Sequence, residues 1–142
     1  MQANSILLPN SCIKEVFISA DINLSPNKNY VVGNINWKGQ DIPLLSLETE
    51  AINDVSATNI KKIIVVVESQ NNQRDKHVCG IVARRVPQVV QANIHSIEKN
   101  LTPKIFHDLA LSYITIKGKP AFIPDMQRLV NDYLVPLTNY RQ

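Results

Sequence analysis

The sequence predicts a mainly β, barrel-like domain that ends in one amphipathic helix. Short apolar segments alternate with polar turns along most of the chain, which predicts roughly eight or more short strands. The β-branched run 63–67 is typical of a central strand. Only residues 126–134 repeat their apolar side chains at three- and four-residue spacing. These observations predict one domain over residues 1–142.

The first half of the chain is expected to form four strands. Polar composition and Pro26 predict a loop over 19–29, and small polar residues predict another over 48–59. The segment 12–18 alternates, with apolar Cys12, Val16 and Ile18 and polar Lys14. The four expected strands are residues 5–8, 12–18, 30–37 and 42–47.

The segment 33–45 is predicted to be a hairpin. Ile35 and Trp37 alternate with asparagines, as in a half-buried strand. The residues 38–41 can reverse the chain, with Gly39 supplying a positive φ if the turn needs one. Pro43 cannot donate to a ladder, so it favours a sheet edge or the start of a strand.

The second half is expected to add further strands and the helix. A polar turn is predicted at 70–76, and a hairpin is predicted across 117–120. Asp125 is a suitable N-cap for the helix, and Pro136 ends it. The expected strands are 61–68, 77–86, 88–94, 109–116 and 121–123.

Bulk composition is that of an ordinary globular domain. The chain has 44% hydrophobic and 19% charged residues, and its formal net charge is +3, which is low for a protein that binds nucleic acid. Cys12 and Cys79 lie in apolar runs, so we expect reduced, buried thiols. No signal peptide and no apolar run of about 18 to 20 residues is found, so we expect a cytoplasmic protein without membrane insertion.

The sequence contains no recognisable catalytic or metal-binding motif. The three histidines, His77, His95 and His107, do not share metal-ligand spacing, and neither cysteine belongs to a C-x-x-C motif. Nucleotide-binding and nucleophile motifs are also absent. We therefore expect a non-enzymatic binding module with no cofactor and no metal.

Arg84 and Arg85 are the most notable basic residues. They interrupt the expected strand 77–86, so at least one guanidinium should point away from the core. Two interpretations stay open: a charged strand face that discourages edge pairing, or an anchor for an acidic partner. Nucleic-acid binding is disfavoured, because it would need more basic residues interleaved with exposed aromatics.

Four segments in order resemble CheW-like chemotaxis coupling domains. The segment 33–47 is similar to the central motif, a glycine and an apolar strand, then a basic residue with glycine, then an apolar–Pro–apolar strand. The other similar segments are 8–16, 78–89 and 121–125, so the resemblance covers nearly the whole chain. Details of 8–10, 37–46 and 123–125 look most like the ChpC and PilI group of type IV pilus systems, which serve twitching motility.

The resemblance implies two interleaved small β-barrel subdomains with a C-terminal helix. It also implies an adaptor that joins the regulatory domain of a CheA-type histidine kinase to the cytoplasmic tip of a methyl-accepting chemoreceptor, recruited to receptor arrays. The receptor hairpin would lie in a groove between the subdomains. The partner-binding residues expected on this basis, with the two arginines added, are Ile13, Glu15, Gly33, Lys38, Val82, Arg84 and Arg85.

Three departures from the family pattern affect the expected partner. Lys38 stands where relatives usually carry arginine, which removes the bidentate fork. Arg84 stands where many relatives carry aspartate, which reverses a charge. The first strand is expected to be short. The alternative functions are a diverged interaction barrel that binds another acidic protein and, less favoured, a small nucleic-acid-binding barrel.

Overall fold

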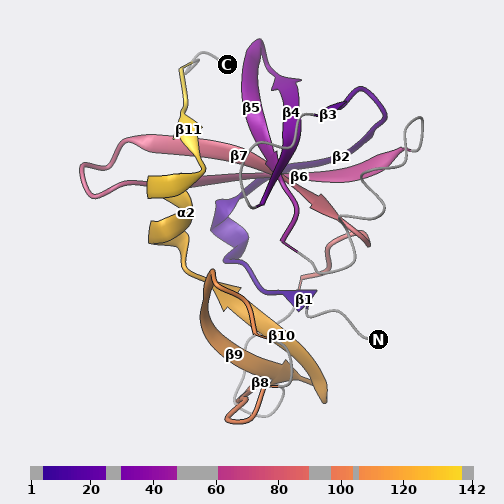
Figure 1. The fold of residues 1–142 in the computed structure, drawn as a ribbon, viewed down its shortest axis with the longest axis vertical. Coiled ribbons are helices and arrows are strands. Elements are labelled where there is room, and N and C mark those ends of the chain that lie inside the picture. Colours follow the sequence, from indigo (N-terminus) through magenta and orange to yellow (C-terminus); the bar gives the residue numbers. More distant parts are fainter. Residues whose placement is uncertain (1–4, 25–29, 48–60, 90–96, 104–105, 139–142) are drawn as a thin grey trace.

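The computed structural model describes residues 5–24, 30–47, 61–89, 97–103 and 106–138, and nearly all of its regular structure is strand (Figure 1). One sheet has four strands in the order β1-β10-β9-β8: β1 (Ser5–Ile6), β8 (Ile97–Lys99), β9 (Ala110–Ile116) and β10 (Lys119–Pro124). The mainly β prediction with a C-terminal helix is confirmed.

The second sheet has seven strands. Six follow the order β2-β6-β7-β5-β4-β3, and β11 also pairs with β7. The strands are β2 (Ile13–Ser19), β3 (Asn23–Leu24), β4 (Val31–Trp37), β5 (Gln40–Leu45), β6 (Lys62–Gln70), β7 (Lys76–Ala83) and β11 (Val135–Pro136). A 3-10 helix, η1 (Asn10–Cys12), precedes β2, and helix α2 (Met126–Asp132) follows β10.

The seven-stranded sheet carries a hydrophobic core on each face. We call the first the shared core, because it joins this sheet to the four-stranded sheet and α2; it includes Val65, Ile81, Phe122 and Leu129. We call the second the Trp37 core; it includes Trp37, Ile42, Ile64, Val66 and Val82. Alternate residues of β6 enter the two cores, which confirms the predicted central strand.

Helix α2 begins where the sequence predicts. The Asp125 Oδ1 atom accepts hydrogen bonds from the backbone N–H groups of Gln127, at 3.2 Å, and Arg128, at 3.3 Å. Such a cap satisfies amide donors that have no partner within the helix. Leu129 and Val130 then bury against the shared core.

Three predicted boundaries are wrong or incomplete. Strand β7 ends at Ala83, so Arg84 and Arg85 follow the strand and do not interrupt it. Gln88 and Val89 are not in a strand, and the remainder of the expected strand 88–94 lies outside the described residues. Strand β3 lies within the segment predicted as a loop over 19–29, whereas the loop predicted at 48–59 is outside the described residues.

A β-bulge near the start of β2 changes which side chains share a face. Ile13 pairs with Val67, but Glu15 pairs with Val66, so Lys14 is the extra residue. Ile13 therefore packs against the shared core, whereas Glu15 points to the face of the Trp37 core. Farther along the strand Val16 and Ile18 are exposed, at 42% and 62%.

An aromatic stack joins the two sheets. The ring of His107 lies between Tyr30, at a centroid distance of 4.8 Å, and Phe122 of β10, at 4.6 Å. The His107 Nδ1 atom accepts a hydrogen bond from the Leu109 N–H at 3.1 Å. Burial lowers the pKa of His107, so the neutral ring is favoured in the fold.

Candidate partner-binding site

The β4–β5 hairpin turns on two residues, Lys38 and Gly39. Trp37 pairs with Gln40 directly across the turn, and φ is 52° at Lys38 and 83° at Gly39. Positive φ at both central positions is typical of the type I′ turn that joins twisted strands. The Asn36 Oδ1 atom accepts a hydrogen bond from the Gly39 N–H at 3.3 Å. The turn therefore needs two left-handed residues, where the sequence predicted at most Gly39.

Trp37 connects two charged side chains at the base of this turn. The residue is 8% exposed, and the Nε1–H of its ring donates a hydrogen bond to the Glu15 Oε1 atom at 2.9 Å. The Lys38 ammonium lies 5.0 Å from the centroid of the same ring, within cation–π range. We call Glu15, Trp37 and Lys38 the Trp37 cluster; it places a carboxylate and an ammonium on one buried aromatic residue.

Gly33 has a steric role within the hairpin. A Cβ atom at this position would lie 2.1 Å from the backbone oxygen of Asn23 and 3.0 Å from the Leu24 Cα atom. Strand β3 therefore approaches β4 more closely than any side chain at this position would allow. Because Gly33 is buried, it shapes the backbone behind the exposed turn.

The remaining predicted residues do not form one patch. Ile13 is half-buried against the shared core, on the opposite face from Glu15. Val82 is 1% exposed in the Trp37 core, so its side chain has no surface to present to a partner. Arg84 and Arg85 are exposed and lie beyond the end of β7.

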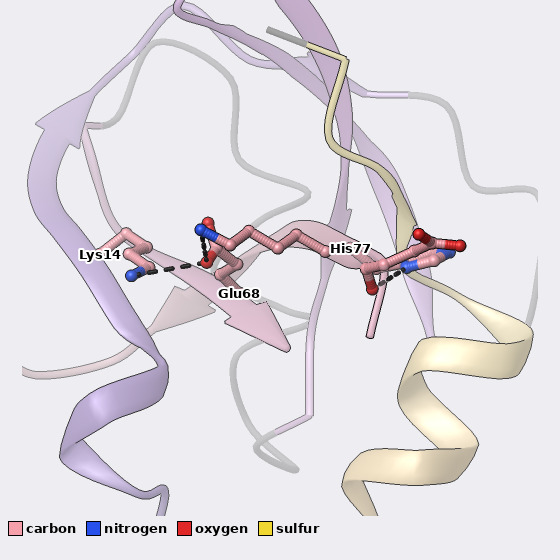
Figure 2. Close-up of polar contacts among 5 residues, drawn as sticks. Lys14, Glu68 and His77 are labelled. Carbon is pink, nitrogen blue, oxygen red and sulfur yellow. Dashed lines mark hydrogen bonds and ion pairs between the residues drawn. The ribbon is translucent and has the colours of Figure 1, made fainter. Parts of the chain in front are cut away.

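The two ends of the β6–β7 hairpin differ in how their charges are arranged. Near the turn, the Glu68 Oε1 atom lies 3.5 Å from the Lys14 Nζ atom and 3.9 Å from the Lys76 Nζ atom (Figure 2). The Glu68 side chain is only 12% exposed, so this carboxylate joins β2, β6 and β7 and balances nearby positive charge. The opposite end carries Lys61, Arg84 and Arg85, all of them exposed.

Comparison with known proteins identifies the family. A family model described as the CheW-like domain matches residues 1–134. The chain belongs to the CheW-like domain family. The crystal structure of the scaffolding protein TtCheW from Thermoanaerobacter tengcongensis has the same fold, with a TM-score of 0.53 and 17% sequence identity over 84% of this chain and 80% of that chain. No curated protein matches the sequence.

This CheW-like domain holds its hairpin through contacts that the sequence did not reveal. The Gln40 side chain donates from Nε2 to the Pro136 carbonyl at 2.7 Å, and its Oε1 atom accepts from the Thr138 N–H at 3.1 Å. These partners lie 96 and 98 residues away, so no local pattern indicates them. The exposure of Val16 and Ile18 was not predicted either. The alternation of apolar and polar residues in a strand does not indicate how far along that strand the core extends.

The described residues of the CheW-like domain contain no group of three or more His, Cys, Asp and Glu side chains that could hold a metal ion. Burial raises the pKa of Cys79 to about 12, which makes its thiol a poor nucleophile. His77, near the start of β7, contacts the Asp75 carbonyl at 3.1 Å through Nδ1, and His95 lies outside the described residues. Among the described helices, none is long and apolar enough to cross a membrane.

Proposed function

We propose that this CheW-like domain is a non-enzymatic coupling adaptor of a chemosensory pathway. It joins the regulatory domain of a CheA-type histidine kinase to the cytoplasmic tip of a methyl-accepting chemoreceptor, and it acts in the cytoplasm at receptor arrays. The observation that carries this proposal is the family match over residues 1–134. Within this function we further propose the type IV pilus branch, on the segments similar to the ChpC and PilI group.

The Trp37 cluster supports the proposal because it presents a charged side chain on a rigid hairpin. Lys38 is exposed at the tip of a hairpin whose conformation is fixed by the turn, by Trp37 and by Gln40. A charge on a rigid support loses little conformational entropy when it pairs with a partner carboxylate. Lys38 and Glu15 are therefore the residues of the predicted set through which we expect the receptor to be contacted.

Isothermal titration of the full chain tests the proposal. A receptor-tip fragment and a kinase regulatory domain are titrated separately, and dissociation constants below about 100 µM are expected for both. Absence of heat and of co-sedimentation with either partner at that concentration would overturn the adaptor function.

Charge reversal at Lys38 tests the site within that experiment. We expect Lys38→Glu to weaken receptor binding roughly five- to tenfold, because a like charge then faces the partner carboxylate. Lys117→Glu is the matched control, since Lys117 has the same turn position and a φ of 51°. Equal losses in the two variants would show that Lys38 is only a turn residue.

A further inference from the structure

The face of the seven-stranded sheet that bears the shared core becomes exposed along three strands at once. In the register, Val16 pairs with Val65 and Val65 pairs with Ile81; one step further, Ile18 pairs with Ile63 and Ile63 pairs with Ala83. Directly paired residues point to the same face. These six side chains therefore form two parallel rows across β2, β6 and β7.

Burial falls from the first row to the second. Val65 is 4% exposed and Ile81 is 3% exposed, whereas their counterparts Ile63 and Ala83 are only half-buried. On the edge strand the exposed fraction rises from 42% at Val16 to 62% at Ile18. The second row is thus an apolar strip at the margin of the core, with Ile18 as its most exposed member.

Three basic residues lie next to this strip along the chain. Lys61 lies two residues before Ile63, and Arg84 and Arg85 follow Ala83 directly, so all three exposed residues lie within two positions of the Ile63–Ala83 pair. Asp21 lies two residues beyond Ser19, the partner of Lys62, and is the one acidic neighbour among the described residues of these strand ends. We call the surface made by Ile18, Ile63, Ala83, Lys61, Arg84 and Arg85 the basic end.

We propose that the basic end docks an acidic amphipathic helix of a protein partner. The apolar strip supplies the contact for the apolar stripe of such a helix, and the three cations face carboxylates that flank this stripe. Helix-in-groove recognition needs apolar anchors beside polar groups that set the orientation, and the basic end has both. This inference rests on the proposed adaptor function and gives the adaptor a docking surface for an acidic helix that is separate from Glu15 and Trp37, which lie on the opposite face of the sheet.

Two other classes of partner fit this surface less well. Single-stranded nucleic acid binds to basic grooves through exposed aromatic rings, and the basic end contains none; the aromatic residue of β2, Phe17, packs against the Trp37 core. A second copy of this chain carries a net charge of +3, so its approach to a cationic surface is opposed at low salt.

Fluorescence anisotropy with two labelled peptides tests the proposal. The acidic probe is a helical peptide of about 18 residues with Leu at positions three and four apart and Glu on both flanks of the stripe. The basic probe has Lys in place of every Glu. We expect the native protein to bind the acidic probe with a dissociation constant below about 100 µM at low salt and the basic probe at least about tenfold more weakly.

Charge reversal at the basic end should invert this preference. The double variant Arg84→Glu/Arg85→Glu should bind the acidic probe at least about tenfold more weakly and the basic probe more tightly. The matched control is Lys117→Glu/Lys119→Glu, which changes net charge equally on exposed residues of the other sheet and should leave both affinities within about twofold. Ile18→Ser should weaken both probes by a factor that does not depend on salt.

Several outcomes would overturn the inference. These are equal binding of the two probes by the native protein, equal losses in the two double variants, displacement of the acidic probe by oligothymidylate, and a dimer that Arg84→Glu/Arg85→Glu disperses. The first two remove the charge recognition, the third indicates a nucleic-acid surface, and the fourth indicates a second copy. If Arg84→Glu/Arg85→Glu melts earlier than the native protein, Arg84→Gln/Arg85→Gln replaces it.

Parallel titration with the receptor-tip fragment separates this inference from the adaptor function. Native protein that binds the fragment but does not distinguish the two probes contradicts the inference and leaves the adaptor function standing. Native protein that distinguishes the probes but binds neither fragment nor kinase domain contradicts the adaptor function.

Discussion

The β4–β5 and β9–β10 hairpins reverse the chain with the same two residues. In the first, Lys38 and Gly39 have φ values of 52° and 83°; in the second, Lys117 and Gly118 have 51° and 80°. Neither glycine has a neighbour within 4 Å of the position of a Cβ atom, so the backbone alone requires glycine at both turns. The two turns are therefore equivalent in local chemistry.

The hairpins differ in what holds them to the rest of the molecule. The β4–β5 hairpin is held close to its turn by two side chains. The Trp37 indole donates a hydrogen bond to Glu15, and the Gln40 side chain donates one to the Pro136 carbonyl. The β9–β10 hairpin is held farther from its turn, where Phe122 stacks on His107 at 4.6 Å. A shared turn sequence thus does not indicate a shared role, because the flanking side chains decide which tip is held rigidly.

The largest difference in stability is expected between replacing Gly33, which lies within a strand, and replacing the two turn glycines. Gly33→Ala should cost about 3 kcal/mol of unfolding free energy, because its Cβ atom would displace the β3 backbone. Gly39→Ala and Gly118→Ala should each cost about 1 kcal/mol, the cost of a left-handed alanine. Urea denaturation measures all three, and a Gly33→Ala loss no greater than the other two would contradict the close approach of β3.

The indole hydrogen bond should have the next largest effect. Trp37→Phe should cost about 2 kcal/mol, from the lost ring volume and from the hydrogen bond at 2.9 Å to Glu15. A double-mutant cycle with Glu15→Ala, which removes the acceptor, should give a coupling of about 1 kcal/mol. Tyr113→Phe on β9 is the control, since its hydroxyl bonds to His107 and should not couple to Glu15. Zero coupling between Trp37 and Glu15 would show that the hydrogen bond between β2 and β4 does not contribute to stability.

Local signals in the sequence were sufficient for the elements that depend on neighbouring residues. The run 63–67 predicted a central strand, and Asp125 predicted the start of α2; the structure confirms both. The hairpin at 33–45 was also predicted, because period-two alternation and a Lys-Gly turn are local patterns. The resemblance to the CheW-like domain family was confirmed by the family model, which matches residues 1–134.

Features that depend on contacts across the fold could not be predicted. The bulge at Lys14 shifts the register of β2 by one residue, so Ile13 and Glu15 point to opposite faces of the sheet. In a regular strand the two side chains would share one face. The apolar character of Val82 and the charge of Arg84 gave no sign that β7 ends between them at Ala83. Of the predicted site, the turn and its charge could be read from the sequence, but its support by Trp37 and Gln40 could not.

The Gln40 side chain allows a third comparison of the hairpins. Gln40→Ala should cost about 1 kcal/mol, because it removes hydrogen bonds to Pro136 and Thr138. Lys119→Ala, at the equivalent position of the other hairpin, should change stability by less than about 0.5 kcal/mol. Hydrogen exchange of the Thr138 amide reports the loss of its bond to Gln40 directly. Unchanged protection of this amide in Gln40→Ala would show that the hydrogen bond does not form in solution.

Acidification should loosen the second hairpin before the first. Burial lowers the pKa of His107 in the fold, whereas the unfolded chain titrates near 6.5. As the pH falls below about 6.5, the unfolded state takes up a proton first, so stability decreases towards the lower pKa of the fold. The effect should be small, because the ring is only half-buried, and His107→Gln should abolish it. Faster exchange in β4 than in β9 at low pH would reverse the expected order.

The smallest difference concerns the two turn lysines themselves. Lys38→Gln should cost up to about 0.5 kcal/mol, because it removes the ammonium that lies 5.0 Å from the centroid of Trp37. Lys117→Gln, at a φ of 51°, changes the same side chain in the same backbone conformation, and Lys117 has no cation–π contact with a ring of the described residues. Thermal melts followed by Trp37 fluorescence measure both variants, and the emission maximum should shift only in Lys38→Gln. Equal stability losses in the two variants would show that Lys38 contributes through the turn alone. The rigid presentation of its charge would then depend on Gln40 and the indole bond to Glu15.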